Sequence, residues 1–280
     1  MRGHRNLAER IINLLVWTSA LFVALVLFAI VVYVGVKGIG VISWEFITQL
    51  PSRMGKEGGI SSTIIGTLYL TAVAVIISTP LGIGAAVYLT EYQKRNSRFT
   101  RLVEASAEAL AGIPSIIFGL FGFIFFVIYL GLGWSILSGG LTLALMILPT
   151  IIRTTQEALS AVPVEFRENS LALGATKWQT ISRVVLPSAA PGIFSGIILS
   201  IGRSVGETAA ILLTAGAALG MPVLPTDPAR SMAVHLYYLT AEGISIERAY
   251  GTALLLIIII LVTNYLANLS LRLFTYRLKG

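Results

Sequence analysis

Arg203 and Glu207 are the residues best placed to do chemistry, because both lie inside an otherwise apolar run. They belong to the heptapeptide GRSVGET at residues 202–208, within an apolar stretch that extends over residues 193–217. On insertion scales an arginine near the centre of a bilayer costs roughly 2.5–3.5 kcal/mol, so such a residue usually faces an interior, a partner or water. The spacing of four predicts that both side chains lie on one face of a helix, within reach of each other.

Two interpretations of this pair stay open. In the first, both residues line a substrate pathway, and the guanidinium of Arg203 presents donors in a geometry that suits tetrahedral oxyanions. Glu207 could then accept the proton of hydrogen phosphate, a hydrogen bond that fully ionised sulfate cannot offer. In the second, Arg203 and Glu207 form a buried ion pair that only fixes how helices pack.

Other reactive side chains are sparse. The chain has no cysteine, one aspartate (Asp227) and two histidines (His4 and His235). Disulfides, thiolate nucleophiles and Cys-ligated metals are therefore excluded, and two separated histidines are too few for a convincing metal cluster. No G-x4-G-K-[ST] sequence occurs, so the chain carries no P-loop of its own. We expect a non-catalytic chain without a metal or cofactor site.

The composition predicts an all-α polytopic membrane protein. Hydrophobic residues make up 56% of the 280, and charged residues only 12%, well below the usual share of about a quarter. Several apolar runs exceed the roughly 20 residues that cross a bilayer as a helix. We predict six transmembrane helices, at residues 11–36, 60–88, 110–130, 136–152, 193–217 and 250–271.

The distribution of basic residues predicts the orientation of these spans. Fourteen of the 20 Lys and Arg residues lie in the two tails and in the second and fourth connections, and five lie in the other loops. Basic residues accumulate on the cytoplasmic side, so both termini and the long connection of residues 157–190 are expected there. This topology also accounts for the net charge of +7 without a nucleic-acid partner.

The connection between the fourth and fifth spans reads as a hairpin of two short helices. Pro163 suits the first turn of a helix, where a missing N–H costs nothing. The first helix can extend to Leu173, and Gly174 then supplies the left-handed residue that commonly ends a helix.

The second helix of the hairpin begins with the spacing of a capping box, Thr176 followed by Gln179. We expect Pro187 to mark its end. Its apolar residues at helical spacing are predicted to share one face: Trp178, Ile181 and Val185.

This hairpin resembles the EAA loop of ABC importer permeases, E-A-A-x3-G-x9-I-x-L-P. The matching residues are Glu168, Ala172, Gly174, Leu186 and Pro187, whereas Asn169, Ser170 and Val184 depart from the pattern. The resemblance implies a coupling helix that docks into a separate ATPase subunit through Glu168, Ala172, Leu173 and Gly174. The alternative is an ordinary amphipathic surface or re-entrant hairpin.

Four further segments resemble the PstA-type permeases of phosphate-specific ABC importers. They are GETAAILLTAG (206–216), AGIPSIIFGLFG (111–122), EGGI (57–60) and PLGIGAAVYLTEY (80–92). Sulfate and molybdate permeases typically show a G-E-F-G-like stretch in place of GETA. The resemblance implies a type I importer fold, with residues 1–59 as tail, first helix and external loop. Residues 60–271 would form the five-helix permease core, followed by a cytoplasmic tail at 272–280.

The same resemblance implies the partners: two PstB-type ATPase subunits that bind ATP and Mg, a second permease of PstC type, and the external phosphate-binding protein PstS. The expected location is the bacterial plasma (inner) membrane. Permeases for sulfate, molybdate or phosphonate remain alternatives. An ion-coupled secondary anion transporter is a further alternative, although such a carrier has no use for the Gly174 hairpin.

Overall fold

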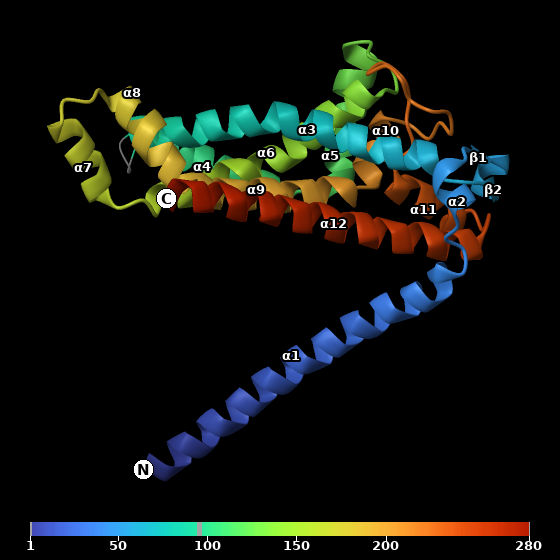
Figure 1. Cartoon of the computed structure of the whole chain (residues 1–280), viewed down its shortest axis with the longest axis horizontal. Coiled ribbons are helices and arrows are strands. Elements are labelled where there is room, and N and C mark those ends of the chain that lie inside the picture. Colours follow the sequence, from blue (N-terminus) through green and yellow to red (C-terminus); the bar gives the residue numbers. More distant parts are fainter. Residues whose placement is uncertain (1, 94–96, 280) are drawn as a thin grey trace.

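The computed structural model describes residues 2–93 and 97–279 and is built almost entirely of helices (Figure 1). Four long helices lie side by side as a bundle: α3 (Ser61–Val87), α6 (Ile136–Ser160), α9 (Leu186–Val205) and α12 (Ile246–Lys279). The remaining elements are α1 (Arg2–Ile39), α2 (Trp44–Thr48), β1 (Pro51–Ser52), η1 (Arg53–Gly55), β2 (Glu57–Gly58), η2 (Tyr88–Tyr92), α4 (Arg98–Gly112), α5 (Ser115–Gly122), η3 (Phe123–Tyr129), α7 (Val164–Ala172), α8 (Lys177–Thr180), η4 (Ile181–Val185), α10 (Ala209–Thr214) and α11 (Met232–Ala241).

The number of membrane-length helices agrees with the polytopic prediction. Within the described residues, five helices are long and apolar enough to cross a membrane, and a sixth span results if one bent pair is counted as a unit. The five are residues Ile12–Ile39, Ser61–Tyr92, Ile136–Ser160, Lys177–Val205 and Ile246–Leu269. The all-α membrane fold is therefore confirmed.

The bent pair includes the span expected at residues 110–130, and the bend lies near the start of that span. Helix α4 ends at Gly112, and the chain turns by 101° before continuing as α5 and the π-helical η3. Ile113 has an extended conformation (φ −73°, ψ 132°). The ring of Pro114 disfavours the helical conformation for the residue that precedes it, which explains why the helix breaks at this point.

The centre of the bundle is the contact between α3 and α6, whose backbones approach closely. A Cβ atom added at Gly140 would lie 2.4 Å from a methyl group of Val73, so only glycine fits there. Helix α6 also continues through Pro149 to Ser160, beyond the end of the span expected at residues 136–152. Neighbouring helices stabilise such proline-containing turns in membrane proteins.

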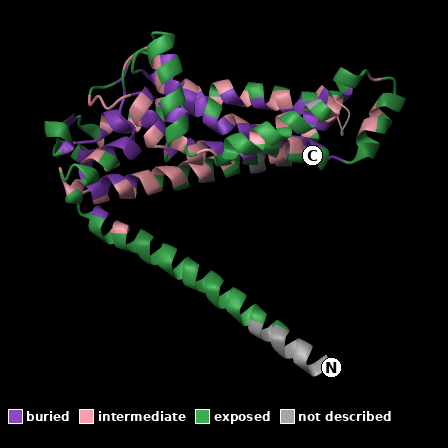
Figure 2. Cartoon of the chain, turned by 180° about the vertical axis from the view of Figure 1, so that it is seen from behind, coloured by how far each residue is buried: buried purple, intermediate pink, exposed green. Residues whose placement is uncertain are grey.

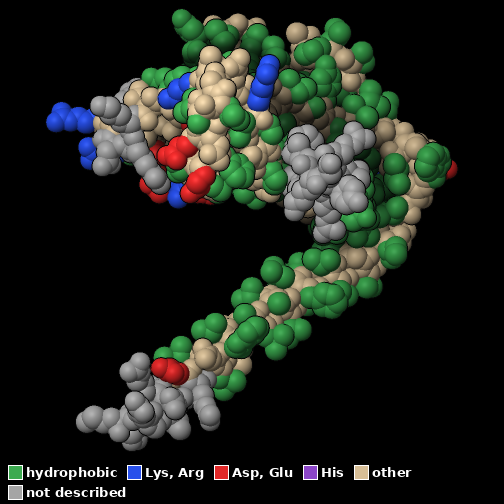
Figure 3. All heavy atoms as spheres, turned by 60° about the vertical axis from the view of Figure 1, so that its left-hand side comes forward, with side chains coloured by type: hydrophobic (Ala, Val, Ile, Leu, Met, Phe, Trp, Pro, Cys, Tyr) green, Lys and Arg blue, Asp and Glu red, His purple; other side chains and the backbone are tan. Residues whose placement is uncertain are grey.

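Helix α1 leaves the bundle at a wide angle (Figure 1). Its contacts with the body lie near its C-terminal end, where Tyr33 packs edge-on against Tyr250 of α12 and Gly38 adjoins the backbone of the same residue. Almost all of its described side chains are exposed (Figure 2). Figure 3 shows this arm covered by apolar side chains, a surface suited to lipid or to another membrane helix.

The two ends of the bundle carry different structures. The α7–α8 hairpin projects from one end, whereas the small antiparallel sheet of β1 and β2, together with α2 and α11, lies at the other (Figure 1). Acidic and basic side chains gather at the hairpin end, which faces forward in Figure 3. The two candidate regions of the chain, the hairpin and the segment around Arg203, thus lie at different positions along the bundle.

Candidate functional site

The hairpin breaks at Gly174, as the sequence predicts. Gly174 has φ +85°, a left-handed conformation that a residue with a Cβ atom adopts only with strain. The N–H of Gly174 donates to the carbonyl of Leu171, and that of Ala175 donates to Ser170, so the last carbonyls of α7 are satisfied. Helix α7 itself ends one residue earlier than expected, at Ala172.

The capping box at the start of α8 is confirmed. The amide of Gln179 donates to the Thr176 hydroxyl, and the Thr176 amide donates to the Gln179 side chain, at 3.3 and 2.8 Å respectively. These two bonds satisfy backbone donors that a helix start leaves free. The sequence therefore determines both the turn and the start of the second helix.

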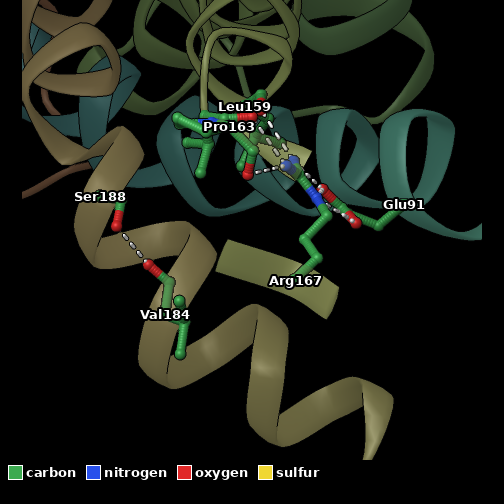
Figure 4. Close-up of polar contacts among 7 residues, drawn as sticks. Glu91, Leu159, Pro163, Arg167, Val184 and Ser188 are labelled. Atoms are coloured by element: carbon green, nitrogen blue, oxygen red, sulfur yellow. Dashed lines mark hydrogen bonds and ion pairs between the residues drawn. The ribbon is translucent and has the colours of Figure 1, made fainter. Parts of the chain in front are cut away.

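The expected end of this helix at Pro187 was wrong. The chain passes from α8 through the π-helical turn η4 into α9, so residues Lys177–Val205 form one continuous span. A π-turn shifts the hydrogen bonds to the i−5 carbonyl, which makes room for a proline that has no N–H to donate. The Ser188 hydroxyl donates to the carbonyl of Val184 at 2.7 Å beside this turn (Figure 4).

The predicted apolar face of the second helix forms only in part. Ile181 and Val185 are buried, and they pack in a cluster with Val87 and Leu159 from the ends of α3 and α6. Trp178, in contrast, is 59% exposed. Helix α7 buries none of its side chains, so this end of the molecule exposes a group of large apolar residues: Val164, Phe166, Leu171, Leu173 and Trp178.

The residues expected to contact a partner lie on the surface of the hairpin. Glu168, Ala172 and Gly174 are exposed, and Leu173 is 90% exposed. A Cβ atom added at Gly174 would meet nothing within 4 Å. These positions are thus accessible to another protein.

An ion pair that the sequence analysis missed attaches the hairpin to the bundle. The guanidinium of Arg167 lies 2.7 Å from the carboxylate of Glu91, and the two side chains are only 19% and 9% exposed (Figure 4). The same guanidinium donates to the carbonyls of Leu159 and Val162 at 2.8 and 2.9 Å. Since 76 residues separate Glu91 from Arg167, no local spacing signals this pair.

Arg203 and Glu207 do not share a helical face, contrary to the prediction. Helix α9 ends at Val205, and α10 begins only at Ala209, so the span expected at 193–217 is broken between the two residues. One oxygen of Glu207 accepts a hydrogen bond from the amide of Ala210 at 3.3 Å, and in the described part of the chain no ion pair joins it to Arg203.

The broken span leaves Arg203 in the last turn of α9, where a cation is stabilised by the negative end of the helix. Arg203 and Glu207 are both partly buried. Next to Arg203, the hydroxyl of Ser204 is buried and has no hydrogen-bond partner among the residues that the structure describes. Interrupted helices of this kind place polar backbone and side chains inside a membrane protein, where they commonly line a site.

A second group of buried basic residues lies at the end of the bundle opposite the hairpin. Arg230 is 3% exposed, donates to the carbonyl of Ala217 and lies over the ring of Tyr238. Its Nη1 is 3.4 Å from Nδ1 of His235. Burial, aided by the charges of Arg230 and Arg248, lowers the pKa of His235 to about 4, so its ring is neutral at pH 7.

The loop before α11 contains Asp227, the one aspartate in the sequence. The amides of Leu224 and Val223 donate to Asp227 and lower the pKa of its carboxyl group. Over residues 2–93 and 97–279, no three His, Cys, Asp or Glu side chains gather in a way that could hold a metal ion.

A family model for the inner membrane component of binding-protein-dependent transport systems matches residues 78–280. The chain belongs to this family. It is therefore a non-catalytic, multi-pass inner membrane subunit, the permease of an ABC importer. Permeases of this kind work with an ATPase that binds ATP and with a substrate-binding protein.

Several relatives carry more specific names. A probable ABC transporter permease of Bacillus subtilis, YqgI, is 32% identical over 95% of both chains. The phosphate transport permease PstA of Mycobacterium leprae is 35% identical over 99% of this chain and 92% of its own length. PstA 1 of Mycobacterium tuberculosis is 39% identical over 75% of this chain and 68% of its own. The resemblance to PstA-type permeases is thereby confirmed.

Solved structures agree with the importer fold. A chain of a bacterial alginate ABC transporter aligns with a TM-score of 0.66 over 92% of each chain, at 17% identity. A chain of the MetNI methionine transporter aligns with a TM-score of 0.64 over 77% of this chain and 95% of its own, at 21% identity. At these identities the likeness concerns the fold alone.

Proposed function

We propose that this chain is the permease subunit of an ATP-driven phosphate importer, in which it forms half of the translocation pathway. The position of Arg203 is the observation that supports the phosphate assignment. Arg203 is partly buried at a break in a membrane span, and no carboxylate pairs with its guanidinium among the described residues. Such a cation favours an anion, and the planar donors of arginine suit a tetrahedral oxyanion.

In this proposal, Glu207 favours phosphate over sulfate. Hydrogen phosphate carries a proton that it can donate, whereas sulfate does not, so a carboxylate near Arg203 favours phosphate. One oxygen of Glu207 is engaged by the amide of Ala210, which leaves the other available. The PstA names of relatives that cover up to 99% of this chain support the same substrate.

The exposed hairpin is the proposed contact with the ATPase. Val164, Phe166, Leu173 and Trp178 form an apolar surface at one end of the bundle, which suits the cleft of a partner better than water. The excess of basic residues in the tails and in this connection supports a cytoplasmic position, where ATP is available. Closure of a PstB-type ATPase dimer would then move the hairpin and switch the pathway from outward to inward access.

The remaining proposed partners are a PstC-type second permease and the external binding protein PstS. To test the assignment, the chain is purified with the proteins that accompany it and is reconstituted in liposomes. We expect ATP-dependent uptake of labelled phosphate that excess sulfate, molybdate or phosphonate does not inhibit. Stronger inhibition by one of these anions than by phosphate would assign that substrate instead, and uptake without the ATPase would support a secondary carrier.

A further inference from the structure

Helix α7 contacts η4 and α8, and polar contacts connect it to the ends of α3 and α6. None of its side chains is buried, and a pocket of about 280 Å³ lies between it and the bundle. The pocket is lined by Glu91, Arg167, Leu171, Lys177, Thr180 and Ile181. Because α7 buries no side chain fully and borders this pocket, a specific contact is needed to fix how it lies against the ends of α3 and α6.

Arg167 makes the contacts that hold α7 in place. Its guanidinium bonds the carboxylate of Glu91, which lies in η2 at the end of α3, through both Nε and Nη2. The same group donates to the carbonyl of Leu159 in the last turn of α6 and to Val162 just beyond it. A single side chain therefore joins the hairpin to the ends of two bundle helices, as Figure 4 shows.

Two weaker contacts also involve the hairpin. The ammonium of Lys177 in α8 lies 4.8 Å from the ring centre of Tyr92, which also belongs to η2. The hydroxyls of Ser170 and Thr180 lie 2.9 Å apart and connect α7 to α8. The first contact connects the hairpin to η2, and the second connects the two hairpin helices to each other. Neither involves α6. Within the described hairpin, Arg167 is thus the residue whose hydrogen bonds reach both η2, at the end of α3, and the last turn of α6.

We propose that Arg167 and Glu91 are positioning residues for energy coupling: their ion pair makes the hairpin move as one body with the inner ends of α3 and α6. The proposal rests on the coupling role proposed for the hairpin. Without the pair, an ATPase would displace α7 into the pocket beneath it, and the displacement would not reach the spans. ATP hydrolysis would then continue with less transport.

The first test measures uptake and ATP hydrolysis together in the reconstituted transporter, with its ATPase, second permease and binding protein. Glu91→Gln removes the charge and keeps the shape of the side chain. We expect it to lower the substrate transported per ATP by about fivefold or more, while hydrolysis persists. Glu108→Gln, in an exposed pair with Arg153, is the matched control and is expected to behave like wild type. An unchanged ratio in Glu91→Gln overturns the proposal.

Arg167→Lys covers the case in which Glu91→Gln does not assemble. Lysine keeps the charge beside Glu91, but one ammonium group cannot bond the carboxylate and both carbonyls at once. We expect partial uncoupling, and full coupling in this variant contradicts the proposal. The double variant with Glu91→Arg and Arg167→Glu is not expected to recover coupling, because a carboxylate at position 167 would face the carbonyls of Leu159 and Val162.

A distance measurement separates coupling from a merely structural role. The chain lacks cysteine, so Glu165→Cys on α7 and Leu81→Cys on α3 give two unique spin-label positions. In a labelled transporter with normal uptake, we expect one narrow distance distribution that ATP does not change, and a broader, ATP-dependent one after Glu91→Gln. Equal distributions in both contradict the proposal. If the unmutated chain shows no ATP-driven uptake, the proposed function fails instead.

Discussion

The molecule contains two sets of arginine and glutamate that differ in whether their side chains form an ion pair. Arg203 and Glu207 are four residues apart, yet the chain breaks between α9 and α10, and no ion pair joins the two in the described part of the chain. Arg167 and Glu91 are 76 residues apart and form a nearly buried pair with a separation of 2.7 Å. Proximity in sequence thus does not by itself ensure contact, whereas packing decides which distant charges meet.

The difference has an energetic basis. Removing charges from water is costly, so a buried pair persists only where further hydrogen bonds satisfy its donors, as Leu159 and Val162 do for Arg167. Among the described residues, no comparable set of acceptors surrounds Arg203, which is consistent with its proposed role in binding the substrate. In our proposals, the first pair positions the hairpin, and the side chains of Arg203 and Glu207 meet the substrate.

Arg167→Ala should have the largest effect on stability. The change leaves the carboxylate of Glu91, which is 9% exposed, without its partner, and breaking a buried pair costs about 3–5 kcal/mol. We expect a clearly lower melting temperature of the purified transporter. A melting temperature equal to that of Glu108→Gln would show that this pair does not differ from an exposed one.

Arg203→Gln should act on uptake and leave assembly intact. Hydrogen bonds to charged groups contribute about 1.5–3 kcal/mol, so the loss of the guanidinium is expected to reduce phosphate uptake by about tenfold or more. The melting temperature should change little, because no ion pair within the described chain depends on Arg203. Wild-type uptake rates in an assembled transporter would exclude Arg203 from the pathway.

His235 is a buried base, and in the described part of the chain no carboxylate pairs with it. Its folded pKa of about 4 lies below the usual 6.5, so the unfolded chain binds the proton first as pH falls. Stability is fully present above pH 6.5 and declines towards pH 4, with a loss of about 2 kcal/mol by pH 5. Melting temperatures at pH 7 and pH 5 should differ less in His235→Asn than in wild type, and an equal difference would contradict this account.

Gly174→Ala tests the turn that presents the hairpin surface. A left-handed residue with a Cβ atom costs roughly 1–2 kcal/mol, although open space surrounds this position. We expect a modest fall in uptake and in recovery of the ATPase with the chain. The same substitution at Gly84, an exposed helical residue without nearby atoms, serves as the control and should have no such effect.

Glu157→Gln should have the smallest effect. Glu157 and Arg153 form an i, i+4 pair with side chains that are 70% and 62% exposed. Exposed pairs of this kind contribute about 0–1 kcal/mol, and salt screens them further. Melting temperature and uptake should stay near wild type at physiological salt, and a large loss would show that burial does not separate the two classes of pair.

Local signals predicted much of the hairpin correctly. The left-handed Gly174 and the capping box of Thr176 and Gln179 depend on short stretches of chain, and both are present. Prolines were less reliable guides. Pro114 does accompany a sharp bend, whereas helices run through Pro149 and Pro187 because a membrane bundle and a π-turn accommodate them.

The sequence by itself determined the membrane class, the positions of most spans and the hairpin, because hydrophobic length, glycine and capping residues act locally. Only the tertiary structure decided that the segment around Arg203 and Glu207 is broken, and that Arg167 meets Glu91. Both outcomes depend on how distant helices pack, since the competition between desolvation and hydrogen bonding is settled by partners that lie far along the chain.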